Sequence, residues 1–414
     1  MAIDFTLTPQ QRKIQHQSRE FARDVLVPAH SAEQLATAEQ RFLATKPAYE
    51  AMIAAGLLRK CIPREAGGES EGLVETAILA EELYSANASV SLTLIGTLLG
   101  LLPILLGGSA EQRGRMLAPF LRNSGAPLAA FCATEPGGSA NAASPPPGEG
   151  VRTSAKREGN SWIINGRKSW VSSASGWDRK GADILCVVCR TNPTGPPERS
   201  VSIIAVERPA TGFVFEHAIE SVGHRAHLLP RVRFDGVAAP RANLLGEEGG
   251  GFALTGASFT GAAALVGIFG VALMRAAFDV ALRFARDERR GGIHPVIEHQ
   301  AVGFALADAK TIIEATRGLT WRACRAVDQK SPTADELAIQ AKIFGSEMAV
   351  RVISDLMRIV GVDSYDCECA LGRLLQDALA LPIFGGGNVG VRRRQFHAIL
   401  KRPGYDPLME GRAV

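Results

Sequence analysis

The stretch FTGAAALVGIFGVALMRAAFDVALRFARDE, residues 259–288, indicates a buried core helix because it has a helical period and is apolar on nearly every side. A helix without a polar face is buried in the middle of a bundle. Two long amphipathic stretches of helical period follow it, EHQAVGFALADAKTIIEATRGLTWRACRAV at 298–327 and ADELAIQAKIFGSEMAVRVISDLMRIVG at 334–361. These patterns predict a C-terminal four-helix bundle over residues 244–414.

Before residue 244 the pattern changes to short alternating or β-branched runs separated by proline and glycine. ADILCVVCRT at 182–191 and SVSIIAVERP at 200–209 have the length and composition of strands. In NSWIINGRKSWVSSAS, residues 160–175, Asn165-Gly166 lies between two apolar runs and favours a hairpin turn. These runs predict a small β domain over residues 127–243.

Helical period also marks the first part of the chain, residues 1–126. Thr8-Pro9 has the residue types of an N-cap and a first helical turn. VSLTLIGTLLGLLPILL, residues 90–106, is apolar but short for a membrane span and contains polar residues, so we expect a buried helix that is kinked or ended at Pro103. The expected fold class is α+β, with an N-terminal helical domain, a central β domain and a C-terminal four-helix bundle.

The totals argue against several function classes. The chain has 414 residues, and its 46 basic and 42 acidic side chains give a net charge of +4, too balanced to indicate a nucleic-acid or membrane partner. The N-terminus has no apolar signal core. The seven cysteines and eight histidines show no spacing typical of a metal site. We therefore expect a cytoplasmic protein with a small-molecule substrate and no metal.

Two short stretches of the β domain have residue types that suit a ligand. FCATEPGGSAN, residues 131–141, combines hydroxyl side chains with a Gly-Gly pair that lets a ligand approach the backbone, although a simple tight turn has the same composition. In the second stretch, Trp170 and Ser172 are two residues apart and would share one face of a strand, which suits a planar heterocycle. The alternative is a core tryptophan beside a loop serine.

In combination, the motifs resemble the acyl-CoA dehydrogenase superfamily over nearly the whole chain. The motifs are TEPGGSAN at 134–141, INGRKSWVSS at 164–173, LLGEEGGGF at 244–252 and EHQ at 298–300. The shortened TEPGGSAN motif and GGNVGVRRRQ, residues 386–395, are similar to the nitroalkane oxidase branch.

The resemblance implies FAD bound between the β domain and the bundle, in a homotetramer. Ser172 matches the hydroxyl that bonds flavin N5, and Arg289 matches an arginine that reaches the FAD phosphates of a neighbouring subunit. The complete set of cofactor contacts that it implies is Phe131, Thr134, Ser139, Trp170, Ser172, Arg289, Gln300, Gly386, Gly387 and Asn388.

The catalytic base is the one element of the pattern that is missing. Acyl-CoA dehydrogenases carry a glutamate and nitroalkane oxidase an aspartate at the position that matches Gly385, which has no side chain to accept a proton. The other family position for a base matches Thr260. Arg392 matches the arginine that pairs with the aspartate of the oxidase, and the serine that supports this pair falls at Ala262. We therefore expect a conserved FAD site without the usual proton-abstracting carboxylate.

Several functions fit this combination. The first is an FAD-dependent oxidase or monooxygenase that uses O₂, acts on a small neutral and partly apolar substrate, and in the monooxygenase case needs a flavin reductase. The second is a nitroalkane oxidase or acyl-thioester dehydrogenase whose base is relocated to His224, His227, Asp178 or Asp377, or was removed by engineering at Gly385. The third is a non-catalytic flavin-binding scaffold.

Overall fold

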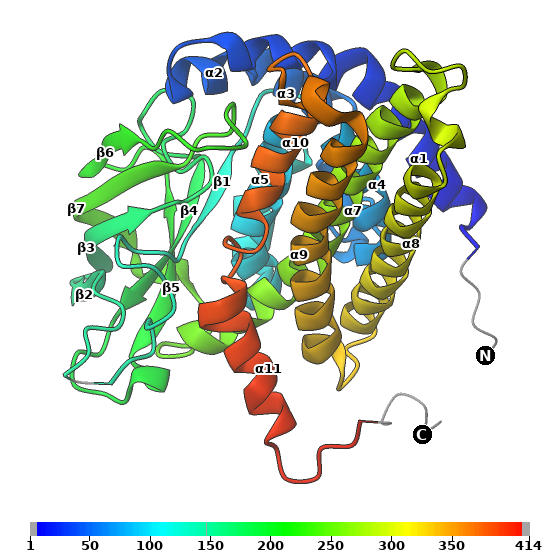
Figure 1. Cartoon of the computed structure of the whole chain (residues 1–414). Coiled ribbons are helices and arrows are strands. Elements are labelled where there is room, and N and C mark those ends of the chain that lie inside the picture. Colours follow the sequence, from blue (N-terminus) through cyan, green and yellow to red (C-terminus); the bar gives the residue numbers. More distant parts are fainter. Residues whose placement is uncertain (1–5, 146, 408–414) are drawn as a thin grey trace.

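The computed structural model describes residues 6–145 and 147–407. Figure 1 shows three parts side by side: a sheet on the left, a bundle of long helices on the right, and N-terminal helices that cross the top and pass behind the bundle. The α+β class and the order of helices, sheet and helices are as predicted.

The N-terminal helices are α1 (Pro9–Phe21), α2 (Ala38–Ala44), α3 (Lys46–Ala54), α4 (Leu73–Ala86), α5 (Ala88–Gly107) and α6 (Ala110–Leu117). Helix α1 begins as predicted, because Thr8 accepts a hydrogen bond from the backbone N–H of Gln11, whose side chain bonds back to Thr8. Helix α5 does not end at Pro103 but continues to Gly107.

The sheet consists of β1 (Ala129–Cys132), β2 (Ser154–Glu158), β3 (Ser161–Ser169), β4 (Ile184–Arg190), β5 (Val201–Glu207), β6 (Phe213–Ala218), β7 (Pro230–Pro240) and β8 (Leu244–Leu245). The strand order is β6-β7-β3-β2-β4-β5-β8, and β1 pairs in parallel with β4. Strand β8 pairs with β5, so the sheet extends slightly past residue 243. The domain boundaries at 126/127 and 243/244 stay predictions.

The predicted turn at Asn165-Gly166 is wrong. Strand β3 runs through both residues, with a change of register against β7 between Ile164 and Gly166. The Asn165 side chain accepts a hydrogen bond from the backbone N–H of Gly236 at 2.8 Å, so tertiary pairing uses the residue that a hairpin turn would need.

The C-terminal bundle consists of α7 (Gly251–Asp287), α8 (Gln300–Asp328), α9 (Ala334–Val360) and α10 (Ala370–Ala380), and α11 (Arg393–Leu400) follows it. The middle of α7 is buried without interruption from Ala263 to Met274, as its composition predicts. Glycines allow α7 and α9 to touch: a Cβ at Gly270 would lie 2.3 Å from the carbonyl oxygen of Gly345. In the described residues, α5 and α7 are long and apolar enough to span a membrane, and 67% of each apolar window is buried inside the protein.

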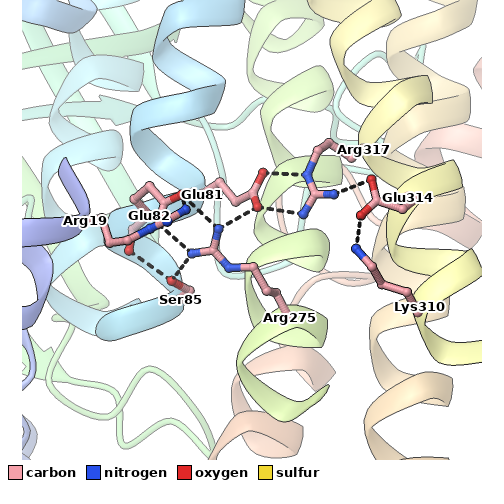
Figure 2. A network of polar contacts seen from close by, with 8 residues as sticks. All are labelled: Arg19, Glu81, Glu82, Ser85, Arg275, Lys310, Glu314 and Arg317. Atoms are coloured by element: carbon pink, nitrogen blue, oxygen red, sulfur yellow. Dashed lines mark hydrogen bonds and ion pairs between the residues drawn. The ribbon is translucent and has the colours of Figure 1, made fainter. Parts of the chain in front are cut away.

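A network of ion pairs joins the N-terminal helices to the bundle (Figure 2). The buried carboxylates of Glu81 and Glu82 on α4 accept hydrogen bonds from Arg275 of α7 at 2.8 and 2.9 Å. Arg317 of α8 also binds Glu81, and Arg19 of α1 also binds Glu82, each at 2.8 Å. A buried carboxylate without a cationic partner is strongly unfavourable, so the ion pairs constrain the positions of α1, α4, α7 and α8 relative to one another.

Candidate active site

The end of strand β1 meets helix α7 through a pair of aromatic rings. Phe131 of β1 stacks on Phe259 of α7 with ring centroids 5.4 Å apart. Phe131 is buried, whereas Phe259 and the three residues after it keep some exposure. The stacked pair therefore marks the junction of sheet and bundle where the resemblance places the flavin.

The glycine loop 134–139 follows β1 and is firmly held at its base. The backbone N–H of Ser169 donates to the carbonyl of Thr134 at 3.0 Å. The buried carboxylate of Glu135 pairs with Lys168 at 3.1 Å. At the tip, Gly138 has φ +84° and a Cβ there would meet nothing within 4 Å, and Ser139 is exposed. A loop that is fixed at its base and open at its tip suits a phosphate-bearing ligand.

Trp170 and Ser172 do not share a strand face as predicted, because β3 ends at Ser169. Trp170 has φ +61°, an uncommon conformation for a bulky residue, and its side chain is 53% exposed. Ser172 is half-buried in the turn that follows. The positive φ therefore places an exposed aromatic ring two residues before the Ser172 hydroxyl, in a turn that strand alternation does not predict.

Behind Ser172 the structure places histidine and threonine side chains that are fully buried. The Ser172 hydroxyl lies 3.0 Å from Nε2 of His227, and Nδ1 of that ring lies 2.9 Å from Oγ1 of Thr93 on α5. Burial lowers the pKa of His227 to about 3, so the ring is neutral. A side chain with this pKa and with both ring nitrogens engaged is a poor general base.

The other candidates for a relocated base are also engaged. The Tyr84 hydroxyl bonds Nε2 of His224, whose backbone N–H donates to the buried carboxylate of Asp377. Burial lowers the pKa of His224 and raises the pKa of Asp377. Asp178 binds Arg208 at 2.6 Å on the surface. None of these contacts joins the four residues to residues 385–392.

Gly385 and Arg392 lie in direct contact. Nε and Nη2 of Arg392 donate to the carbonyl oxygen of Gly385 at 3.1 and 2.7 Å, and Nη2 also donates to the carbonyl of Phe259 at 3.3 Å. Arg392 is 4% exposed, and burial lowers its pKa to about 10. Within the described residues no carboxylate lies within ion-pair distance of it. Gly385 has φ +61°, and a Cβ there would meet only Cγ2 of Val266, at 3.7 Å.

A carboxylate that the sequence did not single out lies beside the second family position for a base. The hydroxyl of Thr260 on α7 donates to Oδ1 of Asp335 at 2.6 Å. Asp335 stands in the first turn of α9 and its charge also raises the pKa of Arg392 against the effect of burial. Nothing in the local sequence signals this proximity, because the two residues are 75 positions apart.

Asn388 uses its side chain to anchor the segment 385–392. Its Oδ1 accepts from the buried amine of Lys342 at 2.6 Å, and its Nδ2 donates to Ser346 at 2.9 Å. Lys342, on α9, also donates to the carbonyl of Leu381 at 2.9 Å, so it holds both ends of the segment that contains Gly386 and Gly387. The sequence did not single out Lys342. The cofactor contacts of Asn388 and the two glycines stay predictions.

Arg289 lies in the connection between α7 and α8, Gln300 is the first residue of α8, and both are exposed. The guanidinium of Arg289 donates locally, to the carbonyl of Ile293 at 2.7 Å. A single chain therefore leaves these two residues on its outer surface, which is where a residue that reaches a neighbouring subunit's cofactor would have to lie. Their contact with FAD stays a prediction.

The residues at the junction fit a flavin nucleotide. The buried hydroxyls of Ser169 and Ser173, which flank Trp170 and Ser172 in the sequence, have no hydrogen-bond partner within the described chain. The open tip of the glycine loop adds a backbone surface for phosphates, and Ser172 adds a hydroxyl group. An exposed ring, uncommitted hydroxyls and a glycine loop at the border of a sheet and a helical bundle indicate a flavin-dependent oxidoreductase.

Comparison with known families agrees with this class. The N-terminal, middle and C-terminal domain models of the acyl-CoA dehydrogenases match residues 8–124, 130–237 and 249–400. The chain belongs to the acyl-CoA dehydrogenase family, as its motifs predicted. Its relatives are FAD flavoproteins, so the cofactor is FAD.

Nitroalkane oxidases are prominent among the relatives. The enzyme of Podospora anserina is 41% identical over 98% of both chains, and that of Fusarium oxysporum is 36% identical over 98% of this chain and 96% of its own. The Podospora anserina structure superposes with a TM-score of 0.94 and covers 98% of this chain and 99% of that one, at 40% identity. A nitroalkane oxidase active-site mutant crystallised with 1-nitrohexane superposes with a TM-score of 0.95 at 35% identity, over 98% of this chain and 99% of its own.

Proposed function

We propose that the protein is an FAD-dependent oxidase or monooxygenase that uses O₂ and acts on a small, partly apolar substrate without a carboxylate base at position 385. One observation carries the proposal: the arginine that would pair with such a base donates instead to the backbone carbonyl of Gly385. A substrate that loses a hydride without prior loss of a carbon-bound proton, such as a neutral amine, does not need that base.

The side chains at the junction have separate tasks in this proposal. FAD, when bound, would supply the hydride acceptor. Phe131 and Trp170 would pack against the flavin ring system, Ser172 would bond near the flavin atom that reacts, and the backbone at Gly138 would face the phosphates of FAD. Nη1 of Arg392 donates to Gln395 at 3.0 Å and has a second N–H for which the described residues provide no acceptor. A neutral substrate with an oxygen or nitrogen acceptor could fill that place.

Anaerobic reduction of the purified protein tests the proposal. The FAD-loaded protein is mixed without O₂ with a primary amine, nitroethane or an acyl thioester, and the flavin absorbance is followed. We expect one class to bleach the flavin, and O₂ to restore the colour with release of hydrogen peroxide. Bleaching only by NAD(P)H and a flavin reductase would identify the monooxygenase form. A protein whose flavin no substrate or reductase bleaches would be a scaffold and would contradict the proposal.

A relocated base is the second candidate, and the Thr260–Asp335 hydrogen bond favours it. In this form Asp335 would take the substrate proton through or beside Thr260, and the protein would be a nitroalkane oxidase. Asp335→Asn should then abolish flavin reduction by nitroethane, whereas exposed Asp308→Asn on α8 should not. If nitroethane does not reduce the wild-type flavin, this candidate is excluded.

We also propose a cytoplasmic homotetramer. Apolar side chains stand largely exposed on the segments around α9 and α10, at Val362, Tyr365, Ile383 and Val389. An exposed apolar surface of this kind is typical of a contact between subunits. Light scattering on the purified protein should give four times the chain mass of 44.0 kDa. A monomer mass would contradict the proposed assembly and the role of Arg289 in a neighbouring site.

A further inference from the structure

A row of buried polar groups runs inward from Ser172, and the function proposed above assigns no task to the groups behind Ser172. Ser172 contacts His227 at 3.0 Å, His227 contacts Thr93 at 2.9 Å, and the Thr93 hydroxyl donates to the backbone carbonyl of Ser89 at 3.2 Å. His227, Thr93 and Ser89 are almost completely buried. Helix α5 packs tightly behind this row, since a Cβ at Gly96 would lie 2.9 Å from Cβ of Ser172.

One set of proton positions uses all three contacts of this row. When the single hydroxyl proton of Thr93 points to the carbonyl of Ser89, its oxygen accepts from Nδ1–H of His227. A neutral imidazole carries one ring proton, so Nε2 has only a lone pair. The hydroxyl of Ser172 must therefore donate its proton inward to Nε2.

The opposite polarity satisfies fewer groups. Thr93 would donate to Nδ1 of His227, and Nε2–H would donate to Ser172. The Thr93 proton would then point to Nδ1 instead of the Ser89 carbonyl, and the row would contain one hydrogen bond fewer. No carboxylate among the described residues contacts the ring, and burial keeps it uncharged, so a doubly protonated ring does not offer a third arrangement.

We propose that His227 is a positioning residue that holds the Ser172 hydroxyl so that only its lone pairs face N5 of the flavin. This inference rests on FAD binding beside Ser172, as the family membership implies. An acceptor at this place can bond the N–H that N5 carries in reduced flavin. It cannot donate to the unprotonated N5 of oxidised flavin. The row therefore favours the reduced cofactor.

The midpoint potential of bound FAD, measured by anaerobic titration against a reference dye, tests the inference. In His227→Leu, the freed Ser172 proton can turn outward and stabilise oxidised flavin. We expect the equilibrium constant for reduction to fall about tenfold, the effect of one hydrogen bond, which is about 30 mV for a two-electron couple. Ser172→Ala should lower this equilibrium constant as well. The decrease in the double variant should be no larger than the decrease in Ser172→Ala alone.

Two milder variants keep the test valid if His227→Leu does not fold. Thr93→Val has nearly the same shape and removes the acceptor for Nδ1–H, so it should shift the potential in the same direction by less. In His227→Gln the amide oxygen can accept the Ser172 proton, so the wild-type potential should be largely restored. Tyr49→Phe is the control, because its buried hydroxyl bonds Thr97 and Pro127 and does not touch the row.

Unchanged or raised potentials in both His227→Leu and Thr93→Val would overturn the inference. A raised potential would indicate that Nε2–H donates to Ser172 in the wild type. The dye titration needs no substrate, so its outcome is separate from that of the proposed function. Substrate oxidation without these shifts would contradict only the role of His227. The shifts without oxidation of any substrate would contradict only the proposed function.

Discussion

The guanidinium of Arg392 donates two hydrogen bonds, at 2.7 and 3.1 Å, to the carbonyl oxygen of Gly385. The fork of an arginine suits the two oxygens of a carboxylate. Here both donors converge on one backbone oxygen at the position where the resemblance places the catalytic carboxylate. The cation is thereby kept in place without a counter-charge among the described residues, and apart from the chain neighbours of Gly385 only Val266 of those residues would lie within 4 Å of a Cβ there.

Gly385→Asp should create a base. Aspartate tolerates the left-handed backbone at φ +61° better than most residues, and its Cβ would meet only Val266 at an ordinary contact distance. The new carboxylate would lie beside Arg392, and we expect flavin reduction by nitroethane to increase roughly 10²–10⁴-fold, the usual contribution of a general base. Gly385→Asn has the same shape without the charge and should show no gain; equal rates in the two variants would contradict this reading.

Gly138→Ala should weaken FAD binding more than it weakens the fold. A Cβ at this residue meets no atom within 4 Å, but φ +84° costs an L-residue about 1–2 kcal/mol. Gly125→Ala is a matched control, because it also has open space and a positive φ, +79°, in the connection before β1. The thermal unfolding temperatures of the two apoprotein variants should fall by similar amounts. Only Gly138→Ala should raise the dissociation constant of FAD in a fluorescence titration.

Arg275→Met should destabilise the protein strongly. The substitution removes the guanidinium that binds both Glu81 and Glu82 and leaves two buried carboxylates short of cations. Loss of one partner of a buried ion pair costs about 3–5 kcal/mol. Lys310→Met, at the exposed end of the same network (Figure 2), should cost about 1 kcal/mol or less. Urea unfolding monitored by circular dichroism measures both; equal losses would show that the network is not buried in solution.

Lys342 should make stability depend on pH. Burial, aided by the nearby charge of Arg392, lowers the pKa of its amine to about 7, far below the value of 10.5 in an unfolded chain. Between these pH values the unfolded state binds more protons than the folded state, so stability must rise with pH, on the order of 1 kcal/mol per pH unit. Relative to Lys342→Met, the wild type should gain stability in urea titrations from pH 7 to pH 9. A constant difference would contradict the lowered pKa.

Local patterns in the sequence predicted much of the fold. The unbroken apolar period of α7 and the Thr8 cap of α1 each depend on side chains within a few turns of one another, and the structure confirms both. The family and its cofactor were also predicted, because their motifs are short and contiguous. Asn165-Gly166 was misread because strand β7 pairs beside it and extends β3 through the expected turn.

Residue identity and order are enough to establish that position 385 has no side chain, that an arginine follows seven residues later, and that the flavin motifs remain. What those residues touch depends on the tertiary structure. In the fold, Arg392 donates to a backbone oxygen, Asp335 contacts Thr260, which is 75 residues away in the sequence, and His227 contacts Ser172, which is 55 residues away. Such contacts depend on how helices and sheet pack together, and no local period or spacing encodes them.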